Sequence, residues 1–307
     1  MNSAMSDRPE ISFILPAYNE CESIVQEIRK VRAVLDAAQI PYEFIVIDDG
    51  SKDNTGELAA REGVRVIRHA KNRGVGGGRK TGILAAKTNY VMTTDADGTY
   101  PAEPIPEMIE IMKTQDFDMV VGARVKEKGT VSWIRTPAKF LIRKLACYMT
   151  RENIPDLNSG LRIFKKSVAL KYFYLLPDTH SWESTITLAF LCNHQRVRYV
   201  PINYFKRSGG VSSFHPIKDT YNYISLIIRT IMYFSPLRIF LPLSFFIFTI
   251  GILKTVFDII QSDRIGGMDV FMLLTSLVIL VAGLLADLMV VLSRKLDPVP
   301  QTPQNFD

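Results

Sequence analysis

Two aspartates separated by one residue are the strongest chemical feature of this 307-residue sequence. Asp95, Ala96 and Asp97 follow the run NYVMTT, which has the composition of a β-strand. In an extended segment residues i and i+2 point to the same side, so both carboxylates can bind one divalent cation. Mg²⁺ or Mn²⁺ held by so few protein ligands takes the others from water and a diphosphate. A solvated turn would look the same, and the position at a strand end favours the metal site.

A second acidic group, Asp48 and Asp49, ends the apolar run YEFIVI. These carboxylates could accept hydrogen bonds from ribose hydroxyls or a base N–H, or they could form an Asx turn before a helix. We expect both functions in this segment. Asp53 to Thr55 cap the helix, while Asp48 and Asp49 face a binding crevice.

The first apolar run, ISFIL, ends at the segment PAYNE of residues 16–20. Tyr18 offers an aromatic ring that could stack on a base, and Glu20 places a carboxylate near it. A plain strand-to-helix turn is the alternative. The segment ends its strand in the same way as the second acidic group does.

Glycine and basic residues are concentrated in residues 72–82, NRGVGGGRKTG. A Walker A loop needs glycine where Arg79 stands, directly before Lys80 and Thr81, and G-x-G-x-x-G also needs its third glycine there. Neither motif fits. We predict a flexible basic loop in which Gly76 lets the backbone approach a substrate and Arg79 or Lys80 lies near phosphate.

The segments that must position these groups alternate between strand-like and helix-like patterns. Short apolar runs occur at 11–18, 42–49, 64–70 and 89–97, with helix-like stretches at 23–38 and 55–63. This alternation predicts an α/β fold with a mainly parallel sheet covered by helices. Ligands bind at the carboxyl ends of strands in such sheets, which is where the polar motifs lie.

Two long apolar runs follow, at residues 237–260 and 270–292. Each is long enough to cross a hydrocarbon core of roughly 30 Å, and the short connector predicts a hairpin. A pair of buried core helices is the weaker alternative, because core helices are seldom apolar on every face. Lys254 and Asp287 lie late in helices that run in opposite directions, so we expect each to snorkel to its own interface.

Basic residues beside the two runs predict their orientation. Arg229 and Arg238 precede the first run, Arg294 and Lys295 follow the second, and the connector carries Arg264. The excess at the outer ends places both ends of the hairpin in the cytoplasm. The residues before the first run, 216–234, have helical spacing of apolar side chains and predict an interfacial helix.

Composition excludes several classes of protein. With 47% hydrophobic residues the chain is not disordered, and three widely spaced cysteines give neither a disulfide scaffold nor a zinc module. The N-terminal segment is polar and is not a secretory signal. The net charge of +6 comes from scattered Lys and Arg without a nucleic-acid-binding pattern. Anionic lipid or a phosphate-bearing substrate is therefore the expected partner, and nucleic acid is not.

Taken in order, seven motifs resemble those of family 2 glycosyltransferases, specifically polyprenyl-phosphate glycosyltransferases of the GtrB and dolichol-phosphate mannose synthase type. The motifs are ILPAYNE, VIDDGSKDNT, NRGVGGGRKTG, TTDADGTYP, VGAR, IPDLNSGLRIF and KRSGGVSSFHP. The resemblance implies a GT-A fold, a nucleotide-diphosphate sugar donor, Mg²⁺ or Mn²⁺, and polyprenyl phosphate as acceptor. It favours UDP-glucose as donor, with UDP-galactose, UDP-N-acetylglucosamine and GDP-mannose left open, and an inverting displacement.

The resemblance also assigns roles to residues. Asp95 and Asp97 would hold the metal, and Ala17 and Ala96 belong to the donor site, whose nucleoside would be held by Pro16, Tyr18, Glu20, Asp48 and Asp49. Arg124 matches the family's arginine close to the reacting phosphates, and we expect Asp97, Arg124 and Asp156 to form the catalytic set. Asp156 and Glu183 are the candidates for a base or orienting carboxylate, with capping or salt bridging equally open. The residues expected to bind the acceptor phosphate are Arg135, Arg143, Ser159, Arg162, Arg207, Ser212 and Ser213. Charges at the membrane surface are the alternative for some of these arginines. The sequence departs from the family pattern at Thr99 and Ser213, where Gln and Lys are common.

We predict a cytosolic catalytic domain at 1–215, the interfacial helix at 216–234, two transmembrane helices within 235–295 and a cytosolic tail at 296–307. Such an enzyme would lie in the inner (plasma) membrane, and its helices could pair between copies in a homo-oligomer. One alternative is a glycosyltransferase that acts on a glycan or another lipid, although a single hairpin makes no polymer channel. Another is a non-catalytic sensor of sugar nucleotides, against which the intact Asp95 and Asp97 argue.

Overall fold

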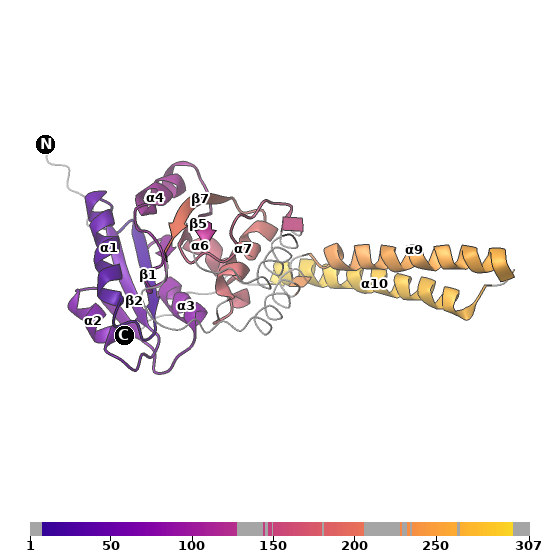
Figure 1. Ribbon diagram of the computed structural model, residues 1–307, viewed down its shortest axis with the longest axis horizontal. Coiled ribbons are helices and arrows are strands. Elements are labelled where there is room, and N and C mark those ends of the chain that lie inside the picture. Colours follow the sequence, from indigo (N-terminus) through magenta and orange to yellow (C-terminus); the bar gives the residue numbers. More distant parts are fainter. Residues whose placement is uncertain are drawn as a thin grey trace. The chain divides into compact units, whose positions relative to one another are not determined.

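The computed structural model describes residues 8–127, 150–179, 181–205, 235–262 and 265–296, with residues 144, 147, 148, 228, 232 and 233. The chain divides into two compact units, one formed by residues 1–223 with 299–307 and the other by residues 224–298. Figure 1 shows the sheet of the first unit and the two long helices of the second.

A mixed sheet forms the centre of the first unit. In the described residues its strands lie in the order β3-β2-β1-β4-β6-β5-β7. The four strands from β3 to β4 are parallel neighbours, β5 and β7 are parallel, and β6 runs antiparallel to β4 and β5. The strands are β1 (Ile11–Ala17), β2 (Tyr42–Asp48), β3 (Arg65–Arg68), β4 (Tyr90–Thr93), β5 (Met119–Glu127), β6 (Arg162–Lys165) and β7 (Val197–Tyr204). The predicted mainly parallel α/β sheet is confirmed.

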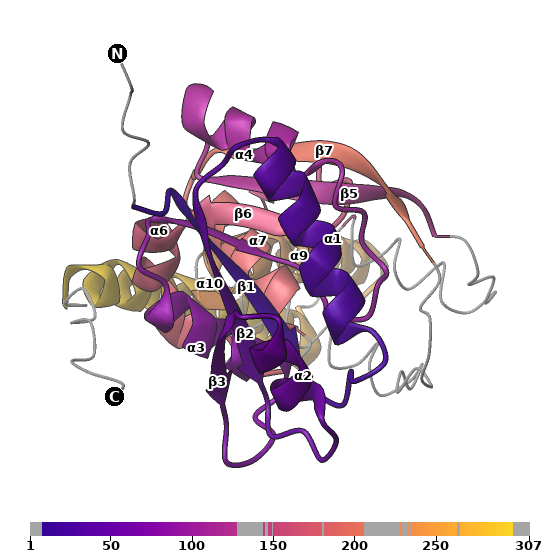
Figure 2. The ribbon, with the colours of Figure 1, turned by 90° about the vertical axis from the view of Figure 1, so that its left-hand side faces the viewer.

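Helices cover both faces of this sheet, as Figure 2 shows. They are α1 (Ile24–Ala37), α2 (Thr55–Arg61), α3 (Val75–Ala85), α4 (Ile105–Thr114), α6 (Lys166–Lys171), the 3₁₀ helix η1 (Phe173–Leu175) and α7 (Trp182–Cys192). Successive strand residues point to opposite faces, so Phe13 packs in one core with α1 and α4, and Ile14 in the other with α3 and α7. Two apolar cores therefore hold the sheet between two layers of helices.

Helix α7 differs from the other helices because residues from Trp182 to Leu191 are all buried. In α1, by contrast, the buried apolar residues recur at helical spacing on one face. Four of the buried residues of α7 are polar, namely Glu183, Ser184, Thr185 and Thr187. Buried polar groups need hydrogen-bond partners, so α7 must carry a polar network into the core.

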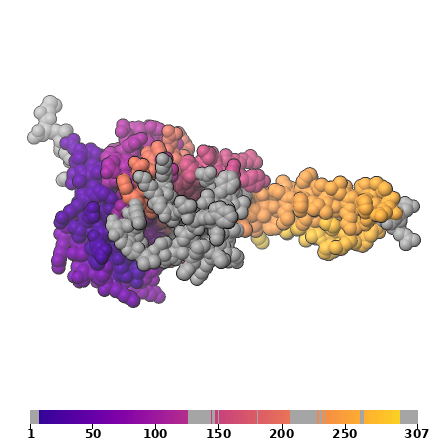
Figure 3. All heavy atoms as spheres, viewed as in Figure 1, coloured from indigo at the N-terminus to yellow at the C-terminus, as the bar shows by residue number. Residues whose placement is uncertain are grey.

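The second unit is a hairpin of α9 (Leu237–Ser262) and α10 (Gly267–Leu296). Its candidate membrane spans are Leu237–Gln261 and Gly267–Leu292, with mean hydropathies of 2.0 and 2.5. Only 11% of each most apolar window is buried, whereas the core helix of a soluble protein is mostly buried. Figure 3 shows the side chains of the two helices packed together along the hairpin. The remaining apolar surface is suited to lipid.

Small and polar residues lie at the contact between the two long helices. Ser244 Oγ donates a hydrogen bond of 2.7 Å to the carbonyl of Ser276, and a side chain at Gly283 would clash with Phe240. Lys254 Nζ lies 2.5 Å from a carboxylate oxygen of Asp258 and 2.7 Å from one of Asp269. Lys254 pairs with both acids because Asp269 lies in the first turn of α10, directly after the hairpin turn. The snorkelling of Lys254 to the interface stays a prediction.

Several sequence predictions lie outside the described residues. They concern the cytosolic tail, almost all of the interfacial helix at 216–234, and the basic flanks Arg229 and Arg264. The side chains of Arg294 and Lys295 are likewise not described. The domain boundaries and the membrane orientation therefore stay predictions.

Candidate functional site

Three adjacent parallel strands bring the polar motifs to one edge of the sheet. Ala17 at the end of β1 is aligned with Asp48 at the end of β2, and Ile14 is aligned with Thr93 at the end of β4. The segments that follow these strands therefore leave the sheet at the same edge. The structure brings the PAYNE segment, the second acidic group and the Asp95 pair together in this way.

The Asp95 pair lies in a turn that follows β4. The strand ends at Thr93 and the chain turns at Ala96 and Asp97, so the segment is not extended as predicted. Both aspartates are half-buried. Asp95 Oδ1 lies 2.5 Å from Arg79 Nη2, and Asp97 Oδ1 accepts a 2.7 Å hydrogen bond from Thr99 Oγ1. Thr99, one of the two departures from the family pattern, thus orients Asp97.

The glycine-rich segment forms a helix, which corrects the prediction of a flexible loop. Helix α3 begins at Val75, and Arg79 and Lys80 lie within it. Its glycines allow close packing: a side chain at Gly76 would clash with the carbonyl of Pro177, and a Cβ at Gly78 would lie 3.1 Å from Pro16 Cβ. Gly76 therefore serves helix packing against the loop before α7. The sequence missed this because glycine is a poor helix former by itself.

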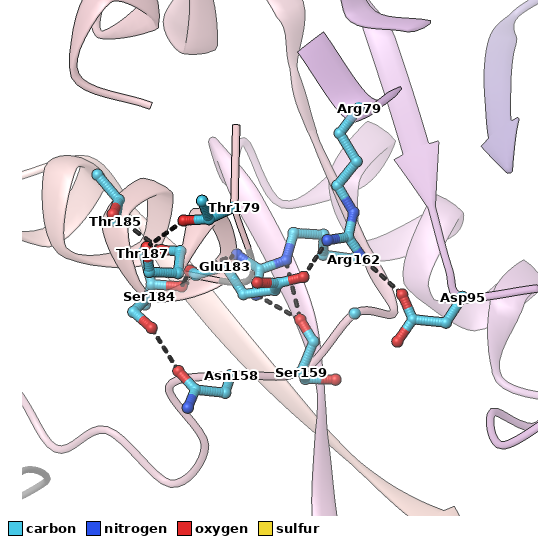
Figure 4. A network of polar contacts seen from close by, with 12 residues as sticks. Arg79, Asp95, Asn158, Ser159, Arg162, Thr179, Glu183, Ser184, Thr185 and Thr187 are labelled. Atoms are coloured by element: carbon cyan, nitrogen blue, oxygen red, sulfur yellow. Dashed lines mark hydrogen bonds and ion pairs between the residues drawn. The ribbon is translucent and has the colours of Figure 1, made fainter. Parts of the chain in front are cut away.

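Arg79 points into the protein from α3. Its side chain is 1% exposed and forms ion pairs with Asp95 and with Glu183 of α7 (Figure 4). Burial by itself would lower the pKa of Arg79, but the charges of Glu183 and Asp95 outweigh it and raise this pKa above its usual value. Arg79 was predicted to lie near phosphate, and in the structure it bonds to the first aspartate of the pair.

The second acidic group is only partly what the sequence predicted. Asp49 is buried, and its carboxylate accepts hydrogen bonds from the backbone N–H groups of Arg73 and Gly74 at 2.9 and 2.8 Å. The same carboxylate pairs with His69 Nδ1 at 2.6 Å, while His69 Nε2 lies 2.8 Å from Thr81 Oγ1. The prediction that Asp49 faces the crevice is wrong, because these contacts use it to fix the chain before α3.

Asp48 keeps an unsatisfied oxygen. Its Oδ1 accepts the backbone N–H of Ser51 at 2.9 Å, whereas its buried Oδ2 has no hydrogen-bond partner among the described residues. The guanidinium of Arg68, which is mostly exposed, lies 3.2 Å from Oδ2. Oδ2 thus has an ion-pair partner in Arg68, and a ligand N–H or hydroxyl would supply the hydrogen bond that it lacks.

The PAYNE segment is tied to the loop after β2. Asn19, whose φ is +55°, accepts the backbone N–H of Lys52 at 2.8 Å through its side chain, and the backbone N–H of Glu20 donates to Thr55 Oγ1 at 2.8 Å. Tyr18 is exposed, as stacking on a base requires. Pro16 and Ala17 are buried at the end of β1 and support this loop.

Arg124 and Asp156 form a bidentate ion pair. Arg124 Nε and Nη2 donate to the two carboxylate oxygens at 2.6 and 2.9 Å, and the ring of Tyr204 lies 5.1 Å from the guanidinium carbon. Burial would raise the pKa of Asp156, but the hydrogen bonds and charge of Arg124 hold it below its usual range. Of the interpretations left open for Asp156, the structure shows the salt bridge.

Arg162 and Ser159 do not form the predicted phosphate site. Arg162 is fully buried, donates to the carbonyl of Ser159 and the hydroxyl of Thr187, and lies against the Trp182 ring (Figure 4). Burial and the charge of Arg79 lower the pKa of Arg162 to about 10. Ser159 is also fully buried. The other predicted phosphate ligands, Arg135, Arg143, Arg207, Ser212 and Ser213, lie outside the described residues.

The segment that contains Ser159 and Gly160 packs against Asp95 and is held by hydrogen bonds. A Cβ at Gly160 would lie 2.7 Å from Asp95 Oδ2, so any larger residue at this position would displace the Asp95 carboxylate. The backbone N–H of Gly160 donates to the hydroxyl of the buried Tyr100 at 2.7 Å, and Arg162 bonds to the neighbouring carbonyl of Ser159. Sequence reasoning missed Gly160 and Tyr100, although NSG and DGTY lie within the quoted motifs.

These residues fit a magnesium or manganese site that a substrate completes. No group of three or more histidines, cysteines and acids with metal-binding geometry occurs in the part of the chain that the structure describes. Two half-buried carboxylates at an open strand edge offer oxygen ligands, which Mg²⁺ and Mn²⁺ prefer over the nitrogen and sulfur of zinc sites. Asp95 and Asp97 can hold such an ion if a diphosphate and water supply the other ligands.

Comparison with known families identifies the catalytic unit. The model of glycosyl transferase family 2 matches residues 12–173, which is more than half of the chain and includes Asp48, Arg79, Asp95 and Asp97. The chain belongs to glycosyl transferase family 2. A second model, the GtrB C-terminal hairpin, matches residues 235–292 and therefore α9 and α10 of this glycosyltransferase.

Curated relatives agree with this assignment. The glycosyltransferase is 30% identical over 203 residues to an uncharacterized protein of Methanocaldococcus jannaschii, covering 64% of this chain and 82% of the relative. It is 30% identical to the undecaprenyl-phosphate 4-deoxy-4-formamido-L-arabinose transferase of Edwardsiella ictaluri, covering 70% and 66% of the two chains. For the same transferase of Aeromonas hydrophila the identity is 31%, covering 62% and 54%. The chain thus spans about two thirds or less of the length of these transferases.

Solved structures show the GT-A fold. Glucosyl-3-phosphoglycerate synthase of Mycobacterium tuberculosis, in complex with Mn²⁺, UDP-glucose and phosphoglyceric acid, matches the glycosyltransferase with a TM-score of 0.59. The match covers 73% of this chain and 80% of the synthase at 17% identity. The predicted GT-A domain followed by two apolar helices is confirmed.

Replacing Gly160 with alanine should impair the glycosyltransferase without unfolding it. The new Cβ would push the Asp95 carboxylate away from its position, and a displacement of about 1 Å can cost about 100-fold in rate. The measurement is kcat/KM for transfer together with the unfolding midpoint. Gly267→Ala is the matched control, because a Cβ there meets nothing within 4 Å. Full activity of Gly160→Ala would show that the position of Asp95 is unimportant.

The Asp156→Asn variant tests the role of the ion pair through pH. Because the pKa of Asp156 is lowered in the folded state, the pair adds stability above the ordinary aspartate pKa and loses it as pH falls through the lowered value. We expect the variant to be about 2–4 kcal/mol less stable from pH 8 to about pH 5, and the difference to shrink below about pH 4.

Unfolding midpoints of both proteins at each pH measure this difference. If Asp156 were instead a general base, the rate of transfer would fall as the pH is lowered through an apparent pKa of about 5–7. The Asp156→Asn variant would then lack this pH dependence. A stability difference that changed between pH 8 and pH 5 would contradict the lowered pKa.

Proposed function

We propose that this glycosyltransferase moves a single sugar from a nucleotide-diphosphate sugar to polyprenyl phosphate at the cytoplasmic leaflet of the inner (plasma) membrane. The observation that carries the proposal is that one chain contains two different units. One is a family 2 domain with paired acids at its strand edge, and the other is an apolar hairpin that matches the GtrB model. The relatives named as undecaprenyl-phosphate sugar transferases support this acceptor.

The donor site would extend along the strand edge. Tyr18 is exposed for stacking on a base, and the buried Oδ2 of Asp48 can accept a hydrogen bond from the nucleoside. A divalent ion on Asp95 and Asp97 would offset the charge that develops on the leaving diphosphate. UDP-glucose is the favoured donor, and the structural neighbour that carries UDP-glucose with Mn²⁺ supports a UDP-sugar and a metal of this kind.

The acceptor needs no strong base. A phosphate monoester has its second pKa near 6, so its oxygen is already anionic at pH 7. That oxygen would form a bond to C1 of the sugar as the C1–O bond to the diphosphate breaks. The bonding electrons leave with the diphosphate and the configuration at C1 inverts. The pairing of Asp156 with Arg124 and of Glu183 with Arg79 supports this scheme, since both acids are engaged by arginine.

Arg124 is the cation that we assign to the reacting phosphates. Asp156 and the ring of Tyr204 fix its guanidinium at the end of the sheet. Asp156 is then a positioning residue and not a base. The hairpin would hold the catalytic unit at the membrane, where its lipid substrate resides, with both termini on the cytoplasmic side.

The test presents the full chain, in nanodiscs, with undecaprenyl phosphate, Mg²⁺ or Mn²⁺ and one nucleotide sugar at a time. The panel contains UDP-glucose, UDP-galactose, UDP-N-acetylglucosamine, GDP-mannose and UDP-4-deoxy-4-formamido-L-arabinose, and products are identified by mass. We expect one lipid product that carries a single hexose from UDP-glucose. Transfer to a glycan or another lipid, with none to undecaprenyl phosphate, would overturn the proposed acceptor.

A further inference from the structure

Arg79 joins the candidate metal ligand to a buried acid far away in the sequence. Its guanidinium bonds to Asp95 through Nη2 and to Glu183 through Nη1, and Arg79 and Glu183 are separated by 104 residues. Glu183 lies in the first turn of the buried helix α7. Asp95, with its side chain 33% exposed, is where this network reaches the open strand edge.

An aromatic ring packs against the guanidinium of Arg79. Its guanidinium carbon lies 5.1 Å from the centre of the Trp182 ring, and Arg162 lies against the same ring at 5.7 Å. Arg162 bonds to carbonyl and hydroxyl oxygens, so the carboxylates of this network are those bonded to Arg79. Figure 4 shows the two arginines side by side between α7 and Asp95.

A divalent cation and Arg79 need the same carboxylate. Asp95 Oδ1 is bonded to Arg79, and Asp95 Oδ2 faces the backbone at Gly160. A cation bound at Oδ1 would lie beside the guanidinium, and two positive charges at that separation repel. The cation can therefore bind well only if Arg79 releases Asp95.

We propose that Arg79 is an internal counter-ion of Asp95 that a divalent cation must displace, and that Glu183 controls the exchange by keeping a second carboxylate available to Arg79. Glu183 is then a positioning residue that sets the affinity for the metal. After the exchange Arg79 stays beside the site, held by Glu183, where a diphosphate can meet it. The inference rests on the proposed function only in taking Asp95 as a metal ligand.

The test measures Mn²⁺ binding to the full chain in nanodiscs by the loss of the free-ion electron paramagnetic resonance signal, with no sugar nucleotide and no polyprenyl phosphate. Glu183→Gln keeps the size of the side chain but leaves Asp95 as the carboxylate of Arg79. We expect this variant to bind Mn²⁺ about tenfold more weakly, the size of effect usual for groups that support metal ligands. Glu110→Gln on the exposed face of α4 is the matched control and should not change binding.

The double variant Arg79→Met with Glu183→Gln separates competition from damage. It removes one positive and one negative charge together, so the net charge of the buried network does not change. We expect it to bind Mn²⁺ at least as tightly as the wild type, and adding Asp95→Asn should abolish binding. If Arg79 and Glu183 only stabilised the fold, the double variant would bind Mn²⁺ more weakly than Glu183→Gln does.

Two further outcomes would also overturn the inference. One is an unchanged Mn²⁺ affinity in Glu183→Gln, and the other is the absence of Mn²⁺ binding in all of these proteins. The measurement needs neither donor nor acceptor. A chain that shows the expected order of affinities but transfers no sugar to polyprenyl phosphate would contradict the proposed function and leave this inference standing.

Discussion

Replacing Asp97 with asparagine should lower the rate of sugar transfer by about a thousandfold. Asparagine keeps the size of the side chain and can still accept the hydrogen bond from Thr99, so the turn after β4 should persist. It loses the negative charge that a divalent ion requires. Loss of one charge-stabilising group at a reacting centre typically costs about 10²–10³ in rate, and an ion with two protein ligands depends heavily on each.

The measurement is the incorporation of labelled sugar into polyprenyl phosphate at saturating Mg²⁺, with membrane insertion checked separately. Asp116→Asn is the matched control, because Asp116 is exposed and pairs with Lys165 on the surface. We expect this control to keep the wild-type rate. Transfer by Asp97→Asn at the wild-type rate would show that the reaction does not use a metal at this pair.

The second large effect concerns the stability of the catalytic unit. Arg162→Met should lower the free energy of unfolding by about 3–5 kcal/mol, because the buried carbonyls of Ser159 and Glu183 lose their donor. Arg162 also supports the segment that holds Gly160 against Asp95. An arginine that bound the acceptor phosphate would instead raise KM for polyprenyl phosphate and leave the unfolding midpoint unchanged.

Thermal unfolding of the full chain in nanodiscs, followed by circular dichroism, measures this effect. We expect the midpoint to fall by about 10 °C. Arg198→Met is the matched control, since Arg198 is exposed on β7, and its midpoint should change little. A stable Arg162→Met variant with a raised KM for polyprenyl phosphate would restore the role that the sequence predicted.

The contrast between Arg124 and Arg162 shows why arginines could not be assigned from the sequence. Both follow or begin apolar strand segments, and both belong to motifs that resemble the family pattern. In the structure Arg124 is paired with Asp156 at the end of the sheet, while Arg162 is enclosed by α7 and Trp182. The environment of Arg162 depends on α7, and that of Arg124 on Asp156, which lies 32 residues later in the chain.

The prediction of a loop for the glycine-rich segment was wrong for a related reason. The residues GGGRK predict a loop because glycine weakens an isolated helix. Here close packing against Pro16, Ile14 and the carbonyl of Pro177 makes glycine the residue that fits. The packing energy outweighs the local preference, and it turns a predicted phosphate loop into a helix that aims Arg79 at Asp95.

The sequence by itself determined the alternation of strands and helices, the two apolar runs and the strand edge at which the acidic motifs meet. These features follow from local periodicity and from the geometry of parallel strands, which depend on residues close together in the sequence. The tertiary structure decided which charged residues face the edge and which are buried. Burial and pairing join residues as distant as Arg79 and Glu183, so only the packed chain could assign Asp49 and Arg162 to the scaffold.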